Sequence, residues 1–93
     1  MKYILNWEID PDRFDEAIEK LKRIVPDESG TYPKKLSDSF SLGGEFRGFR
    51  LVEATSEQQI NLMVNAAPEM LVSFEPIIEF PKVVEAYLKA KSS

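Results

Sequence analysis

Four polar side chains of this 93-residue chain have types and positions that could support chemistry: Asn6, Glu8, Arg50 and Glu75. An arginine guanidinium can hold a carboxylate or a polarised carbonyl through paired hydrogen bonds. Asn6 could orient a carbonyl or an enolate, and Glu8 or Glu75 could act as a general base if burial made it more basic. The same groups could equally form a structural ion-pair network. We predict that these four residues bind a ligand.

Other kinds of catalytic group are missing from the sequence. The chain has no His and no Cys, so an imidazole base and a thiol nucleophile are both excluded. Its acidic residues do not recur at metal-ligand spacing, and we predict no metal and no cofactor. Gly43-Gly44 lacks the strand-to-helix context and the Lys of a phosphate-binding loop, so we interpret it as a hairpin turn.

Composition limits the class of protein and its partners. Residues 1–93 are predicted to form a single domain, and a chain of this size has a small core that a dimer contact would support. The net charge of −4 argues against nucleic acid as a partner. The sequence has no apolar run of the length that a membrane span or a secretory signal needs, and it has no cysteine. We therefore predict a cytoplasmic protein that does not bind membranes.

The hydrophobic periodicities follow the order strand, helix, strand, strand, helix, strand, with a short helix at the end. Asp10-Pro11 and Ser56 with Gln59 are typical helix starts. Pro76 predicts that the last strand lies at an edge of the sheet or is kinked, because proline cannot donate to a ladder. The predicted strands cover residues 2–9, 36–42, 47–54 and 71–80, and the predicted helices start near positions 10, 56 and 81.

This order predicts an α+β fold: a ferredoxin-like βαββαβ sandwich with a short C-terminal helix. Two helices would cover one face of the sheet and leave the other face bare. Phe49 and Leu51 are predicted to pack beneath the helices, whereas Arg50 and Val52 would lie on the bare face. The other residues predicted on the bare face include Ile4, Asn6, Glu8, Ser37, Ser39, Ser41, Ser73, Glu75 and Ile77. Such a mixed surface favours a homodimer through the sheet face, with about 1,200–2,000 Å² buried in total.

Several short motifs match a known pattern: Met1-Lys2-Tyr3 with Trp7, an acidic-Pro helix start at Asp10-Pro11, and Arg47-Gly48-Phe49 followed by Leu51-Val52-Glu53-Ala54. With these motifs the chain resembles, over nearly its whole length, a small bacterial family of the dimeric α+β-barrel superfamily that is described only as a domain of unknown function. The resemblance implies a ferredoxin-like protomer and a homodimer whose two sheets face each other. It implies no established activity.

Other branches of that superfamily include cofactor-independent monooxygenases, muconolactone-type isomerases and stress-responsive barrel proteins. The resemblance also implies a His near the end of the second strand, where this chain has Phe40-Ser41 and no His anywhere. This departure counts against acid–base catalysis.

Three functions are compatible with these observations. The first is a small-molecule-binding homodimer that uses the cavity between facing sheets. The second is a cofactor-independent monooxygenase or isomerase acting on an aromatic or enolisable substrate, in which Asn6 and Arg50 stabilise an oxyanion. The third is a structural or partner-binding module, for which the segment from Val83 to Leu88 would supply an exposed apolar patch.

Overall fold

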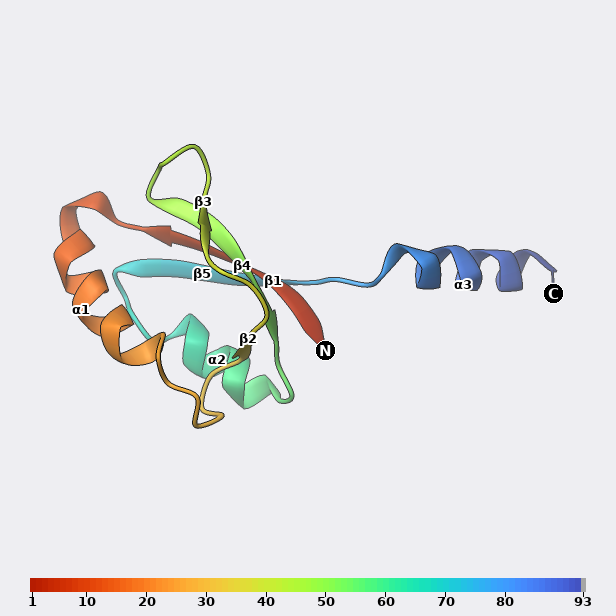
Figure 1. Cartoon of the computed structure of the whole chain (residues 1–93), viewed down its shortest axis with the longest axis horizontal. Helices are drawn as coiled ribbons and strands as arrows, with labels where there is room; N and C mark the ends of the chain where they lie inside the picture. Colours follow the sequence, from red (N-terminus) through yellow and green to blue (C-terminus); the bar gives the residue numbers. More distant parts are fainter. Residues whose placement is uncertain (93) are drawn as a thin grey trace.

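The computed structural model describes residues 1–92 and has an α+β architecture with one antiparallel sheet (Figure 1). Its strands are β1 (Lys2–Ile9), β2 (Lys34–Lys35), β3 (Phe40–Ser41), β4 (Arg47–Glu53) and β5 (Met70–Pro76). Its helices are α1 (Phe14–Ile24), which follows a 3-10 turn η1 (Pro11–Arg13), α2 (Glu57–Val64) and α3 (Phe80–Ser92). The strand order is β2-β4-β1-β5, and β3 also pairs with β4. The predicted α+β class is confirmed.

The helix starts lie where the sequence places them. The Asp10 side chain accepts a hydrogen bond from the Asp12 amide at 3.0 Å, and Pro11 follows it as the first residue of η1. The Ser56 hydroxyl accepts from the Gln59 amide at 3.3 Å at the start of α2. Each cap satisfies an amide that has no partner within its own helix.

The predicted strand over residues 36–42 is interrupted. Within that range only β3 is a strand; β2 ends before it at Lys35, and the residues between β2 and β3 are not assigned to a strand. The Ser37 hydroxyl accepts from the Leu51 amide at 2.9 Å and donates to the Asp38 carbonyl at 2.9 Å. A side chain thus takes the place of a ladder hydrogen bond, as Ser residues often do. Pro76 ends β5, which is an edge strand as predicted, and the extended pattern does not continue to residue 80.

The core forms where both α1 and α2 pack against one face of the sheet, here called the helix face. Ala17 of α1 and Met63 of α2 belong to the same buried cluster as Leu5, Ile9 and Val52 of the sheet. The opposite face is covered by no described element and is here called the open face. The register places on it Ile4, Asn6 and Glu8 of β1, Phe49 and Leu51 of β4, and Leu71, Ser73 and Glu75 of β5.

The prediction for the faces of β4 is wrong by one residue. Arg50 lies opposite Leu5 and Val52 opposite Tyr3, and residues opposite each other in an antiparallel pair share a face. Arg50 and Val52 therefore lie on the helix face, and Phe49 is on the open face opposite Asn6. Phe49 and Leu51 give the open face of β4 more apolar residues than Val52 gives the helix face, so alternation alone favoured the wrong face for the core.

Glu69, just before β5, connects α1 to the sheet. Its Oε1 accepts from Lys20 Nζ at 2.7 Å and from Arg13 Nη2 at 3.3 Å, while the residue is only 4% exposed. The hydrogen bond from Lys20 is the main cause that holds the pKa of the Glu69 carboxyl below its ordinary value of 4.5. A carboxylate whose pKa is lowered by folding stabilises the fold above the unfolded value and loses that contribution as the pH falls.

We expect Glu69→Gln to lower the melting temperature at about pH 7 and to have a progressively smaller effect below about pH 4. Melting curves of both proteins over this range measure the difference. Glu16→Gln is the matched control, because Glu16 contacts Arg13 only at an exposed site, 3.4 Å away. A penalty for Glu69→Gln that stays constant down to about pH 3 would show that ionisation of Glu69 is not its cause.

Candidate functional site

A cavity of about 510 Å³ lies between the helix face, α1 and the loops that precede β2 and β4. This volume is within the range of small-molecule sites, which is roughly 300–1,000 Å³. Most of its wall is apolar, as is typical of sites that take up the body of an organic ligand. The wall residues include Leu5 and Trp7 of β1, Phe14, Ile18 and Leu21 of α1, and Phe46.

Two buried nitrogens at this cavity lack hydrogen-bond partners. Arg50 Nε and Trp7 Nε1 are both inaccessible to solvent, and no acceptor for either lies within the described part of the chain. Leaving a buried donor without an acceptor costs about 1–3 kcal/mol, and more for a charged group. Buried polar groups almost always have partners, so the wall of this cavity is unusual in carrying two unsatisfied donors, one of them in a guanidinium that has no ion pair among residues 1–92.

The acids at the cavity already have hydrogen-bond donors. Asp27 accepts from the Ser29 amide at 2.8 Å, and hydrogen bonds from the Ser29 side chain and amide hold the pKa of Asp27 below its ordinary value. Glu45 accepts from Arg47 Nε at 2.5 Å, and this contact raises the pKa of Arg47. Neither acid is ion-paired with Arg50 among residues 1–92.

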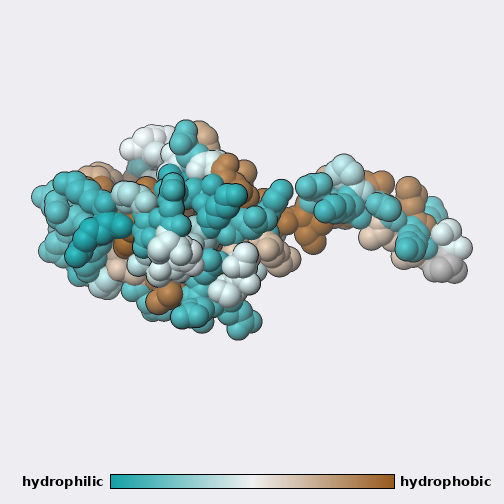
Figure 2. All heavy atoms as spheres, turned by 60° about the horizontal axis from the view of Figure 1, so that its bottom comes forward, coloured by the Kyte–Doolittle hydropathy of each residue, from teal (hydrophilic) through white to brown (hydrophobic). Residues whose placement is uncertain are grey.

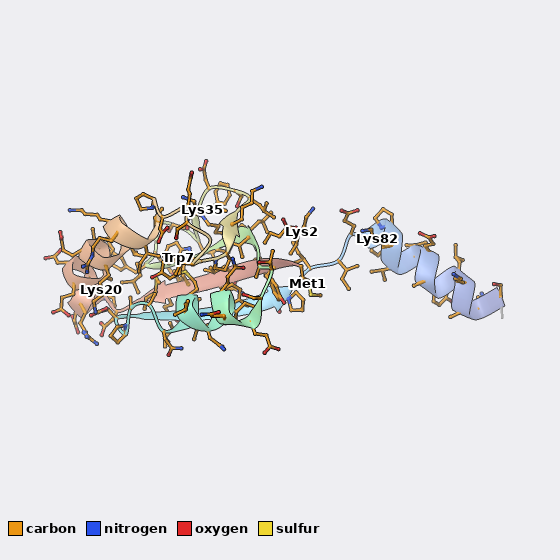
Figure 3. All side chains as sticks on the ribbon, turned by 90° about the horizontal axis from the view of Figure 1, so that it is seen from below. Met1, Lys2, Trp7, Lys20, Lys35 and Lys82 are labelled. Carbon is orange, nitrogen blue, oxygen red and sulfur yellow. The ribbon has the colours of Figure 1, made fainter. Side chains whose placement is uncertain are left out.

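The two cations of the cavity differ in what they contact. Lys35 Nζ donates to the Val25 carbonyl at the end of α1, so one of its donors is used. Arg50 has no recorded ion pair in the part of the chain that the structure describes. A second, more open hollow shares both residues, which places them where the two hollows meet. Trp7 and Lys35 are labelled in Figure 3, which shows the body of the protein with its side chains.

The four ligand residues predicted from the sequence do not come together in one chain. Asn6, Glu8 and Glu75 lie on the open face, whereas Arg50 lies on the helix face, on the other side of the sheet. Glu75 is opposite Ile4, four residues from Glu8, so the two carboxylates are roughly 13 Å apart along the strands. The enzyme hypothesis needs Asn6 and Arg50 at one oxyanion, and within one chain these two side chains lie on opposite faces of the sheet. The role of the four residues in binding a ligand stays a prediction.

Sequence reasoning missed the residues that line the cavity. Ser39 and Ser41 were expected on the bare face but line the cavity, since Ser41 lies opposite Gly48 on the helix face. Trp7 both packs against the core and lines the cavity. One signal in the sequence was the spacing of Arg50 and Val52. Residues two positions apart in a strand share a face, so Arg50 had to lie on the same face as Val52 in either register of β4.

Comparison of the chain with protein-family models, curated proteins and solved structures finds no significant match. The family resemblance therefore stays a prediction. Among residues 1–92, no helix is both long and apolar enough to cross a membrane. Within the same residues, no group of three or more acidic side chains is arranged to hold a metal ion.

Proposed function

We propose that this protein is a small-molecule-binding homodimer and that each chain binds an amphipathic organic anion in the cavity beside α1. The Arg50 guanidinium, which lines an apolar cavity and has no ion pair among residues 1–92, is the observation that carries this proposal. The apolar body of the ligand would contact the side chains from β1 and α1. Its carboxylate, or a similar acidic group, would accept hydrogen bonds from the Arg50 guanidinium, with Lys35 as a second cation nearby.

The strand order and the position of the helices support a ferredoxin-like fold, which we propose together with this function. β1 and β4 are the central strands, and α1 and α2 both contribute to the core on one face. In such a sandwich the volume between helices and sheet is normally filled by side chains. Here Gly48, Arg50 and Ser41 contribute little apolar volume to the helix face near α1, and a cavity results.

The proposed homodimer would use the open face. Ile4, Phe49 and Leu51 form a half-buried apolar row there, and Leu71 at the edge is 72% exposed. Soluble monomers seldom leave a contiguous apolar surface of this kind uncovered. In this contact Phe49 and Leu51 take the place that the sequence-based prediction gave to Arg50 and Val52, and the proposed ligand cavity lies beside α1 instead of between the facing sheets.

Titration calorimetry with decanoate tests the binding site. We expect saturable binding of one decanoate per chain, and much weaker binding of decanol and decyltrimethylammonium, which have the same chain without the negative charge. Arg50→Gln should weaken decanoate binding by roughly 10- to 100-fold, because a hydrogen bond to a charged group contributes about 1.5–3 kcal/mol.

Arg23→Gln is the matched control. Arg23 is an exposed arginine of α1 that does not line the cavity. We expect this variant to bind decanoate as the unaltered protein does. Equal binding of decanoate and decanol, or equal losses in the two Arg variants, would contradict a role for Arg50 at the cavity.

A further inference from the structure

α3 stands away from the rest of the protein as an arm (Figure 1). It has 13 residues, none of which is buried among those described. Apolar side chains recur along it at the spacing of one helix face, and they are between 39% and 74% exposed. Figure 2 shows these patches as brown areas on the arm, between teal polar ones. They form the stripe Phe80, Val83, Val84, Tyr87 and Leu88.

A helix of this length is not stable by itself in water. Isolated helices shorter than about 12–15 residues are marginal even in alanine-rich sequences, and helices in proteins are stabilised mainly by packing an apolar face. Val83 and Val84 are β-branched and lower helix propensity further. The arm therefore needs a surface to cover its stripe.

The arm is directed away from its own sheet. The Ile77 amide donates to the Lys2 carbonyl at 3.1 Å, which extends the pairing with β1 one residue beyond Pro76. Lys2 Nζ and Glu79 Oε1 are 4.0 Å apart and hold the next residues beside the same strand end. Folding back onto its own sheet would require the chain to reverse between Ile77 and Phe80 and to break these contacts. In Figure 3, Lys82 lies on the arm, beyond Met1 and Lys2 at this end of the sheet.

We propose that two copies exchange their arms, so that the stripe of each α3 lies across the open face of the other copy. This inference rests on the proposed homodimer and identifies the element that covers its sheet face. The dimensions agree: α3 is about 20 Å long, and the eight residues of β1 span about 27 Å.

The surface that would be buried is large enough for a stable dimer. Phe80 and Tyr87 are 74% and 62% exposed, and a buried aromatic side chain removes about 150–250 Å² from water. At these exposures the four rings of two arms bury roughly 400–700 Å², and Val83, Val84 and Leu88 of each arm and Phe40 and Leu71 of each open face add to this area. The sum reaches the roughly 1,200 Å² at which stable interfaces begin.

Charge also favours α3 of a second copy as the element that covers the open face. Lys91 lies three helical turns beyond Phe80 on the side of the stripe and brings a positive charge toward the surface that the stripe covers. On the open face, Glu75 forms no ion pair within residues 1–92. The exchange would place a cation of one copy on a face where the other copy has an uncompensated acid.

Disulfide trapping tests the exchange, because the natural chain contains no cysteine. One preparation carries Phe49→Cys and a second carries Leu88→Cys, and the two are mixed and oxidised. We expect a covalent heterodimer linked between positions 49 and 88. Lys89→Cys in place of Leu88→Cys is the matched control, because Lys89 is the next residue of α3, lies on the side opposite the centre of the stripe and should trap far less.

A chain that carries both Phe49→Cys and Leu88→Cys distinguishes the alternatives. A covalent dimer supports the exchange, whereas a cross-linked monomer would show that α3 folds back on its own sheet and would overturn it. Cross-links between two copies of position 49 alone would show direct sheet-to-sheet contact, and an absence of cross-links would likewise overturn the exchange.

A second variant tests the exchange without cysteines. Tyr87→Glu with Leu88→Glu should give a monomer of about 10.6 kDa by light scattering, whereas Lys82→Glu should remain a dimer. A monomeric natural chain that sediments with anionic vesicles would instead assign the stripe to a lipid surface and overturn the proposal. Decanoate titration of the same samples distinguishes a failure of the arm exchange from a failure of the proposed ligand site, because loss of the arm contact is expected to leave the cavity intact.

Discussion

Val52→Glu is expected to unfold the protein under conditions in which Leu51→Glu remains folded. Val52 is 2% exposed in the core, so the new carboxylate would be removed from water and its longer side chain would overpack the space of the valine. Overpacking and the desolvation of a charge together cost on the order of 3–5 kcal/mol or more, a large part of the roughly 5–15 kcal/mol that stabilises a domain. The melting temperature should fall by about 15–40 °C.

Leu51→Glu places the same charge one residue away, on the open face. We expect this variant to keep the circular dichroism spectrum of the natural chain and to become monomeric in light scattering. The pair of variants thus tests the register of β4. If Val52→Glu stayed folded and dissociated the dimer while Leu51→Glu unfolded, the two faces of β4 would be exchanged.

Gly48→Ala should give the second large loss of stability. A Cβ atom at this position would lie 1.8 Å from the Phe40 carbonyl oxygen and 2.6 Å from Trp7 Cζ2. The backbone of Phe40 cannot move aside as the end of a flexible side chain can. Either β3 must separate from β4, or the indole ring of Trp7 must shift. Overpacking of this kind costs about 1–3 kcal/mol, which denaturant titration can measure.

Gly44→Ala is the control, because it separates steric contact from backbone strain. Gly44 has φ = 76°, but nothing lies within 4 Å of a Cβ placed there. We expect a loss of about 1 kcal/mol from the unfavourable φ alone, and unchanged Trp7 fluorescence. A Gly48→Ala protein as stable as the natural chain would contradict the close approach of β3 to Trp7.

The sequence was sufficient for the elements whose signals are local. Asp10 and Ser56 begin their helices by hydrogen bonds within three residues, and Pro76 restricts β5 to an edge. The interruption between β2 and β3 depends on a contact between Ser37 and Leu51, fourteen positions apart in sequence. No local pattern carries that information.

The candidate site could be predicted only in part, because its position depends on the register of β4. Arg50 was predicted as a ligand-binding residue, but it was placed on the same face as Asn6 and Glu75. In the structure it lies on the helix face, and they lie on the open face. Phe49 and Leu51 are as apolar as Val52, and the choice between them depends on the whole core. The cavity itself results from side chains of β1, α1 and two loops, which no spacing rule brings together.

The fluorescence of Trp7 is the most direct measure of the central claim, which is that the cavity beside α1 binds an amphipathic anion at Arg50. Trp7 is the single tryptophan of the chain and lines this cavity, so its emission reports on the site alone. We expect decanoate to change the emission in a saturable way, with one ligand per chain, and Arg50→Gln to shift the midpoint roughly 10- to 100-fold upward. Trp7 emission that does not respond to decanoate, or that responds equally to decyltrimethylammonium, would contradict the claim.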